Sequence, residues 1–384
     1  MTQRTIKVLH IITKMDWGGA QENTLLTVQG LRGPRFEVHL ASSPGGDWEH
    51  KAREIADRYF VIPSMRRGIY LLKNARAFLE LFDLVRSNHY DVVHTHSTNA
   101  GLLGRAAAKL AGVPVIVHTV HGFGFEDQTF SRLARNILIQ LERFAGRITD
   151  RLIMQAKRNA HEAVEMRIAP KEKVITIYSG INLNRFHQSY DTQGMKTQLN
   201  IPRDSFVVGW VGRMTEQNAP RIFLKAAKSL SEMYPNFHFL MVGDGHLRSY
   251  CEEMSRGNSQ IFFTGYRSEI HKMYEAMDVL VSTVRWAGLG RTITEAMASG
   301  LPVISTGVNG VPEIVEDGVT GLIIPDDAPD AIVSAVKNLF LNPDLRGKLA
   351  ENAREIVTSV FSVGEMIEQT KTLYLNILKE KNQA

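Results

Sequence analysis

Short apolar runs alternate with amphipathic stretches along almost the whole chain. Runs such as Phe206–Val211 and Phe237–Val242 have the length of buried strands, whereas Pro220–Met233 repeats its apolar residues at helical spacing. This alternation is typical of βα units wound around a parallel sheet. The sequence therefore predicts an α/β protein built from parallel sheets.

The first half shows the alternation most fully. Strands are expected at Lys7–Ile12, Glu37–Ala41, Asp91–His94, Val115–Thr119, Leu152–Met154 and Val174–Ile177. Helices are expected at Gln21–Leu31, Leu72–Ser87, Gly101–Ala111, Phe130–Ile148 and Lys157–Met166.

Around residues 182–204 the pattern lapses into a polar segment of low periodicity and then restarts. The predicted parts are an N-terminal domain at 1–185, a linker at 186–204, a C-terminal domain at 205–362 and a last helix at 363–384. Both domains are expected to be Rossmann-like, doubly wound sheets that face each other across a cleft, with the last helix packing back toward the N-terminal domain. Ligands bind such sheets at the carboxyl ends of the strands, where loops and helix N-termini converge.

The composition is that of an ordinary globular protein, but charge is distributed unevenly between the two halves of the chain. No apolar run approaches the roughly 20 residues that span a bilayer, and the amino terminus is expected to be a first strand, not a signal peptide. The single cysteine, Cys251, excludes an intramolecular disulfide and fits a cytoplasmic protein. Residues 1–180 carry 25 Lys and Arg against 17 Asp and Glu, a net +8, while residues 181–384 carry −3. A basic first half favours an anionic partner such as a diphosphate lipid, a membrane surface or nucleic acid.

The richest candidate segment runs from Ser282 to Gly300, where a strand ends, a glycine-containing loop follows and a helix begins. Free backbone N–H groups and the helix dipole at such a start attract phosphate. The candidate ligand-binding residues here are Gly288, Leu289, Gly290, Arg291 and Glu295. Glu295 lies one turn into the helix, where its carboxylate can accept bonds from the vicinal hydroxyls of a ribose. The alternative is a tight βα turn followed by a surface carboxylate.

Three further strand ends carry glycine turns. Gly212 and Arg213 follow one strand, and the planar guanidinium of Arg213 suits a diphosphate, although an exposed loop arginine is the alternative. Gly243 follows the next strand. Gly265, with Tyr266 and Arg267 after it, closes a third and could hold a nucleotide base through backbone groups.

In the first half, Gly18 and Gly19 join the first strand to its helix, another N-terminus able to face a phosphate or an acceptor. His121 follows the strand Val115–Thr119 and could contact a sugar hydroxyl or the leaving phosphate, although a lone histidine there is more often structural. His94 and His96 share one face of a strand without a third ligand in view, so a metal site is not expected.

The sequence has no Asp-x-Asp signature to hold a cation under a diphosphate, and no metal or other cofactor is expected. In order, its loops resemble those of the family-4 retaining glycosyltransferases of GT-B fold. The matching segments are the Gly18-Gly19 loop, DVVHTHS at 91–97, His121-Gly122, YSGINLNRF at 178–186, VGR at 211–213, VGDGHLR at 242–248, FTGY at 263–266, EAMASGLPVI at 295–304 and GVPEIVEDGVTGLIIPDD at 310–327.

The resemblance implies a nucleotide-diphosphate sugar donor, with a UDP-sugar favoured, in the second domain and an acceptor in the first. It implies that Arg213 binds the diphosphate, that Glu295 binds the ribose and that His121 faces the donor sugar. It also implies transfer with retention of configuration, in which the leaving phosphate helps to deprotonate the acceptor.

Two positions depart from the family pattern. Ala287 stands where the family has the first of two paired glutamates, and Asn218 stands where it has a lysine that pairs with the diphosphate. The sequence therefore predicts an impaired or inactivated glycosyltransferase, and the alternative is a catalytically silent protein that binds sugar nucleotides. A sugar-nucleotide epimerase is disfavoured because its acid–base carboxylates cannot be located, and nucleic-acid binding because no basic motif interleaved with aromatic residues occurs.

The expected acceptor is a glycan or a polyprenyl-diphosphate-linked glycan of surface polysaccharide synthesis. Two segments mix basic and bulky apolar residues: Met65–Lys73, and a stretch that contains Phe130, Arg132, Leu133, Arg135, Ile137, Leu141, Arg143, Phe144 and Arg147. Either could lie on an anionic membrane, which predicts a cytoplasmic protein peripheral to the inner face of the membrane. The alternative is an ordinary amphipathic helix packed on its sheet.

Overall fold

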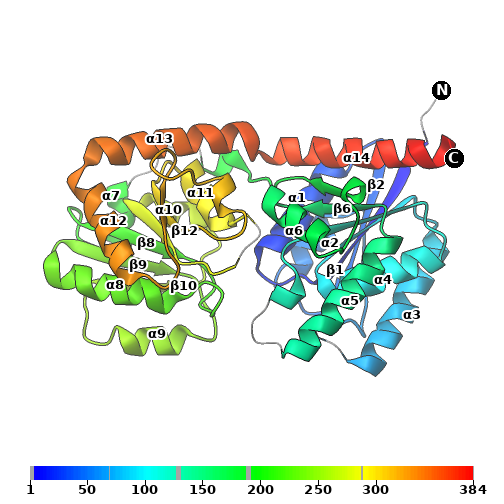
Figure 1. The fold of residues 1–384 in the computed structure, drawn as a ribbon, viewed down its shortest axis with the longest axis horizontal. Helices are drawn as coiled ribbons and strands as arrows, with labels where there is room; N and C mark the ends of the chain where they lie inside the picture. Colours follow the sequence, from blue (N-terminus) through cyan, green and yellow to red (C-terminus); the bar gives the residue numbers. More distant parts are fainter. Residues whose placement is uncertain (1–3, 69, 127–130, 187–191, 287–288, 384) are drawn as a thin grey trace. The chain divides into compact units, whose positions relative to one another are not determined.

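A computed structural model describes residues 4–68, 70–126, 131–186, 192–286 and 289–383 (Figure 1). The chain forms two compact units, each with its own core. The first unit comprises residues 1–180 and 363–384, and the second comprises residues 181–362.

The first unit is built on a seven-stranded parallel sheet with the order β3-β2-β1-β4-β5-β6-β7. Its strands are β1 (Ile6–Lys14), β2 (Phe36–Ser43), β3 (Arg58–Val61), β4 (Val92–His96), β5 (Val115–Val120), β6 (Arg151–Met154) and β7 (Val174–Thr176). The chain winds outward from β1 to β3 and then returns to place β4 on the other side of β1. Loops after β1 and β4 therefore diverge at this switch point, where open α/β sheets bind ligands.

Helices cover both faces of this sheet. They are α1 (Gly19–Leu31), α2 (Glu49–Ile55), α3 (Leu71–Asn88), α4 (Thr98–Leu110), α5 (Arg132–Ile148), α6 (Lys157–Glu165) and α14 (Val363–Gln383). Alternate strand residues point to opposite faces: Val8 belongs to the core that α1 and α14 cover, and Leu9 to the core that α3 and α4 cover. Such burial on both faces explains why the strands are nearly continuous apolar runs.

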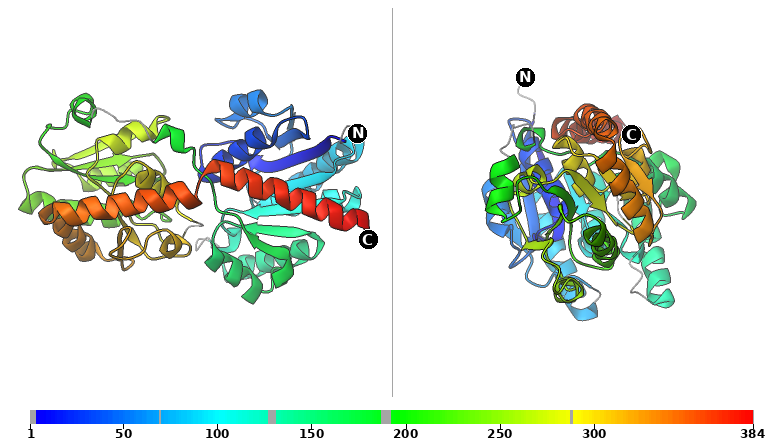
Figure 2. Two further views of the ribbon diagram at one scale, coloured as in Figure 1. Left: turned by 90° about the horizontal axis from the view of Figure 1, so that it is seen from above. Right: turned by 90° about the vertical axis from the view of Figure 1, so that its left-hand side faces the viewer.

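The C-terminal helix α14 belongs to the first unit although it follows the second in sequence. It packs on α1, and Figure 2 shows it lying along the first unit. Tyr374 is fully buried, and its hydroxyl lies 2.5 Å from Nδ1 of His94 in β4. The helix thus completes the core of the first unit with both apolar and polar contacts.

The second unit repeats the winding with a six-stranded parallel sheet of order β10-β9-β8-β11-β12-β13. Its strands are β8 (Phe206–Val211), β9 (Phe237–Val242), β10 (Ile261–Gly265), β11 (Val279–Ser282), β12 (Val303–Thr306) and β13 (Leu322–Ile324). Its helices are α7 (Thr192–Gln198), α8 (Pro220–Met233), α9 (Arg248–Met254), α10 (Ile270–Glu275), α11 (Arg291–Ala298), α12 (Pro329–Leu341) and α13 (Pro343–Val360). The switch point lies between β8 and β11.

Of the segment predicted as a linker, 186–204, the described residues 192–204 belong to the second unit and contain helix α7. Helix α7 buries a lysine, Lys196. Its Nζ donates to the carbonyl of Ser205 at 2.8 Å and lies 3.2 Å from Oδ2 of Asp278. A helix that is anchored by a buried charge shows no apolar period, so the sequence pattern missed it.

Candidate functional site

The carboxyl edge of the second sheet brings three predicted glycines together. The N–H of Gly212, after β8, donates to the carbonyl of Val242 at 3.0 Å, and the N–H of Gly243 donates to the carbonyl of Gly265 at 2.9 Å. Gly243 has φ +130°, and a Cβ added there would lie 2.0 Å from the carbonyl oxygen of Gly212. Only glycine fits such a close approach of two loops.

Helix α11 begins at this edge on the other side of the switch point. Gly290 precedes it with φ +91°, and Leu289 is buried. The N-cap residue Gly290 has no side chain, and the N–H of Ile293 donates to the carbonyl of Gly290 at 3.0 Å. The helix dipole makes such an N-terminus favourable for an anion. Ala287 and Gly288 lie outside the described residues.

Glu295 is buried one turn into α11, with 6% of its surface exposed. Its Oε1 accepts from Nε of Arg291 at 3.0 Å, and its Oε2 accepts from the hydroxyl of Tyr274 in α10 at 3.1 Å. The side chain of Arg291 therefore orients Glu295, a role that the sequence analysis did not assign, although the i,i+4 spacing signals it.

The loop after β8 holds Arg213 and Asn218. Arg213 is exposed, and its carbonyl accepts from Nδ2 of Asn218 at 2.8 Å. The carbonyl of Asn218 in turn accepts from the hydroxyl of Thr283 at 2.6 Å. Asn218 thus closes its own loop and ties it to the loop after β11.

Gln217 strengthens the same connection and was missed by the sequence analysis. Its amide donates to the carbonyl of Trp286 at 2.7 Å, and its own carbonyl accepts from the N–H of Arg285 at 2.8 Å. The loops on the two sides of the switch point therefore form one hydrogen-bonded platform.

The candidate base-binding turn lies at the end of β10. Gly265 has φ +68°, Tyr266 is partly buried and Arg267 is exposed. Arg248 lies against Gly265 and is itself ion-paired to Asp244 at 2.8 Å. The structure therefore gathers the described candidates of the second half at one sheet edge.

In the first unit, Gly18 precedes α1, Gly19 begins it, and His121 follows β5. These residues lie at the carboxyl edge of the first sheet. His121 keeps part of its surface exposed, whereas burial lowers its pKa to about 4, and a hydrogen bond to Gln155 opposes part of that shift. A histidine of this kind is neutral at physiological pH.

The sequence analysis saw no third histidine beside His94 and His96, and the structure supplies one. His10 in β1 lies next to β4, and its ring centroid is 4.9 Å from that of His94. One nitrogen from each of His10, His94 and His96 lies within 4.8 Å of the others.

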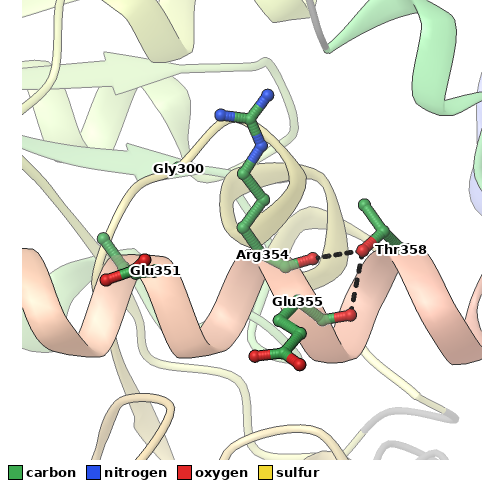
Figure 3. Close-up of a pocket in the computed structure, with 6 residues that line it drawn as sticks. Gly300, Glu351, Arg354, Glu355 and Thr358 are labelled. Carbon is green, nitrogen blue, oxygen red and sulfur yellow. Dashed lines mark hydrogen bonds between the residues drawn. The ribbon is translucent and has the colours of Figure 1, made fainter.

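A hollow of about 470 Å³ lies elsewhere in the second unit (Figure 3). It is lined by Gly300, Ala350, Glu351, Arg354, Glu355 and Thr358. None of the candidate residues lines this hollow, so it is not part of the candidate site.

Comparison with known proteins agrees with this geometry. The sequence model described as "Glycosyltransferase Family 4" matches residues 17–185, and the one described as "Glycosyl transferases group 1" matches residues 191–356. An Escherichia coli protein named UDP-Gal:alpha-D-GlcNAc-diphosphoundecaprenol alpha-1,3-galactosyltransferase is 30% identical over 99% of both chains. The chain belongs to the family-4 glycosyltransferases. A Staphylococcus aureus relative, the capsular polysaccharide biosynthesis glycosyltransferase CapM, is 25% identical over 92% of this chain and 93% of its own.

The fold of this glycosyltransferase also has solved counterparts. Alr3699/HepE from Anabaena, in complex with UDP and glucose, superposes with a TM-score of 0.84 at 21% identity, covering 96% of this chain and 99% of that one. The predicted GT-B class with two Rossmann-like parallel-sheet domains is confirmed. None of the helices in the described residues is both long and apolar enough to cross a membrane.

Proposed function

We propose that this glycosyltransferase moves a sugar from a UDP-sugar to a lipid-linked or polysaccharide glycan, with retention of configuration and without a metal. The observation that carries the proposal is the platform at the carboxyl edge of the second sheet, where the start of α11, Glu295 and the loop of Arg213 converge. The names of the Escherichia coli and Anabaena proteins favour UDP as the nucleotide and a diphosphate-linked lipid as the acceptor carrier.

The chemistry follows from charge. As the bond between the sugar C1 and the diphosphate oxygen breaks, negative charge grows on the diphosphate. Arg213 and the N–H groups that open α11 would stabilise that charge in place of a cation. The acceptor hydroxyl bonds to C1 on the same face and passes its proton to the leaving phosphate oxygen. No enzymic nucleophile is required.

Ala287 and Asn218 would make this reaction slow. One lost charge-assisted contact costs about 1.5–3 kcal/mol, and loss of a group that acts at the transition state lowers a rate by about 10²–10³. The second candidate function, a silent sugar-nucleotide-binding protein, rests on the same two positions.

Binding is tested first, by thermal shift with UDP-, GDP- and ADP-sugars, each with and without a chelator. Ligands that bind the folded form raise its melting temperature. We expect a shift with UDP-sugars that the chelator leaves unchanged. No shift with any sugar nucleotide contradicts both candidate functions, and a shift abolished by the chelator contradicts the metal-free mechanism.

Rescue then separates the two candidates. The double variant Ala287→Glu with Asn218→Lys restores both charges, and Ala287→Gln with Asn218→Gln is the uncharged control of similar size. Because Gln217 lies in the same loop, a second arm places the lysine there with Gln217→Lys. Sugar transfer that is recovered in a charged variant but not in the uncharged control supports the enzyme. UDP-sugar binding without recovered transfer supports the binding protein.

We further propose that the first unit lies on an anionic membrane through α5 and the start of α3. The exposed apolar residues of α5 are Leu133, Ile137, Leu141 and Phe144, and those at the start of α3 are Tyr70, Leu71 and Leu72. Arginines accompany them: Arg143 and Arg147 line a hollow of about 260 Å³ together with Gln140, Phe144 and Arg167. Of the residues predicted for this role, Met65 is buried and cannot take part, and Ile69 and Phe130 lie outside the described residues.

Co-sedimentation with phosphatidylglycerol or phosphatidylcholine vesicles tests the membrane proposal. We expect binding to the anionic vesicles and its loss in Leu133→Ser with Phe144→Ser. The control is Met233→Ser with Leu341→Ser, which changes two exposed apolar residues of the second unit. Equal binding to both lipids, or equal loss in both variants, contradicts the proposal.

A further inference from the structure

Three histidines form a hydrogen-bonded row in the first unit. Nδ1 of His10 lies 2.9 Å from Nε2 of His96, and Nδ1 of His96 lies 3.2 Å from Nε2 of His121. The row begins in β1, crosses to β4 and ends in the loop after β5. His10 and His96 are fully buried, whereas His121 reaches the surface at the carboxyl edge of the sheet.

The rings of this row are neutral. Burial lowers the pKa of His10 to about 3 and that of His96 well below its usual value, and burial also lowers the pKa of His121 to about 4. A neutral imidazole has one N–H donor and one nitrogen that accepts. Only two proton arrangements then satisfy both hydrogen bonds, with all donors directed toward His121 or all directed toward His10.

The inner end of the row decides between the two arrangements. Nε2 of His10 is buried and has no hydrogen-bond partner among the described residues. If the donors are directed toward His121, this nitrogen carries no proton and has an unused lone pair. If they are directed toward His10, it is an unpaired buried N–H, which is the rarer group in folded proteins. The first arrangement is therefore the more stable.

In that arrangement His10 donates to His96, and His96 donates from Nδ1 to Nε2 of His121. The proton of His121 must then be on Nδ1. A hydrogen bond between the His121 ring and the side chain of Gln155 is compatible with this state, because the amide oxygen of Gln155 can accept from Nδ1–H.

We propose that His10 and His96 are positioning residues that hold His121 as its Nδ1–H tautomer. Because its Nε2 lone pair is already engaged, His121 cannot act as a base. Its one N–H, at Nδ1, is directed to Gln155, and a ligand oxygen can accept from it by taking the place of Gln155. The consequence for sugar transfer rests on the proposed function, in which His121 faces the donor. It makes His121 a hydrogen-bond donor to the sugar or phosphate and leaves proton removal to the leaving phosphate.

A metal ion is the competing explanation for three clustered histidines. The nitrogens of His94 are already 2.5 Å from the hydroxyl of Tyr374 and 2.7 Å from that of Thr119. A divalent ion held by neutral imidazoles alone would also bring uncompensated positive charge into a buried core, which is costly. The hydrogen-bonded row therefore accounts for the cluster better.

Nitrogen-15 NMR of histidine-labelled protein reads the tautomer of His121 directly. In His96→Asn, the side-chain amide stands near the position of Nδ1 and still donates, whereas His96→Leu has no donor. We expect the Nδ1–H tautomer in the unsubstituted protein and in His96→Asn. In His96→Leu the tautomer ratio should shift toward Nε2–H by at least tenfold, which corresponds to about 1.4 kcal/mol, the size of one hydrogen bond.

His118→Asn is the matched control for disturbance of the core. His118 is equally buried and bonds to the hydroxyl of Thr95, outside the row. Its substitution should leave the His121 tautomer unchanged. An Nε2–H tautomer in the unsubstituted protein, an unchanged ratio in His96→Leu, or stoichiometric Zn²⁺ binding that shifts the His10 and His96 signals would overturn the proposal. The tautomer is measured without ligand, so failure of UDP-sugar binding would sink the proposed function and leave this inference standing.

Discussion

Acid should destabilise the first unit of this glycosyltransferase selectively. Five described histidines there have at most 3% of their surface exposed, and for one of them, His39, a hydrogen bond to Glu37 opposes the effect of burial. The other four are His10, His94, His96 and His118. Burial lowers the pKa of each: to about 3 for His10 and well below the ordinary value for the other three. The folded unit therefore keeps these rings neutral at pH values where the unfolded chain protonates them.

The magnitude follows from proton linkage. Well above pH 6.5 these histidines are neutral in both the folded and the unfolded state, and they cost no stability. As the pH falls from 6.5 toward the folded pKa values, only the unfolded chain takes up protons, and the free energy of unfolding decreases. At pH 5.5, one unit below the unfolded pKa, each histidine costs about 1.4 kcal/mol. Four such sites cost about 5–6 kcal/mol, against a total stability of about 5–15 kcal/mol for a domain. The expected fall in melting temperature is about 10–20 °C for a unit of this size.

Hydrogen exchange measured by mass spectrometry at pH 7.5 and 5.5, corrected for the intrinsic exchange rate, separates the two units. Peptides from β1, β4 and β5 should lose the most protection at the lower pH. Peptides from β8 and β11 should lose less, because burial lowers the pKa of only two described histidines of the second unit, His238 and His271. His10→Asn should reduce the pH dependence by about one quarter if the four sites act equally. His50→Asn, at an exposed histidine of the same unit, should not change it. Equal protection at both pH values, or equal loss in both units, would refute the argument.

Three substitutions test other parts of the structure. Tyr274→Phe removes the hydroxyl that donates to Glu295 and should weaken UDP-sugar affinity about three- to tenfold in calorimetry, with little change in the melting temperature. Arg105→Met breaks a buried 2.7 Å ion pair with Glu142 and should cost about 3–5 kcal/mol in urea unfolding, whereas the added change Glu142→Leu should recover much of it. Gly243→Ala places a Cβ 2.0 Å from the carbonyl oxygen of Gly212 and should abolish UDP-sugar binding in the thermal-shift assay. Unchanged binding in Gly243→Ala would show that the loop after β9 is not part of the donor site.

The sequence pattern predicted the inner strands well and the outer elements poorly. The predicted segments Phe206–Val211, Phe237–Val242 and Pro220–Met233 match the structure residue for residue, because each is either a run buried on both faces or a strongly amphipathic helix. Strand β3 is a short edge strand with one exposed and three half-buried residues, and α13 buries only Leu349, Ala353 and Val357. Weak one-sided burial leaves little periodicity, so neither element was predicted.

The candidate site likewise has a part that could be predicted from the sequence and a part that could not. Glycines at strand ends could be predicted because the requirement for close loop approach is local, and Gly212, Gly243 and Gly265 do meet. The partners of the site residues are not local: Tyr274 is 21 residues from Glu295, and His10 is 86 residues from His96. His10 reaches the row only because β4 lies beside β1, which depends on the strand order.

The structure also changes what Asn218 implies. Replacing a lysine of a donor site by asparagine would remove a positive charge. The side-chain amide of Asn218 instead donates to the carbonyl of Arg213 and so closes the loop after β8. Its carbonyl connects that loop to Thr283, and Gln217 connects it to Trp286. A chain that had simply lost function would have no physical reason to retain a platform whose hydrogen bonds all depend on the substituted loop. In the proposed function the platform is therefore the part of the donor site that would remain for ligand binding, whether or not the sugar is transferred.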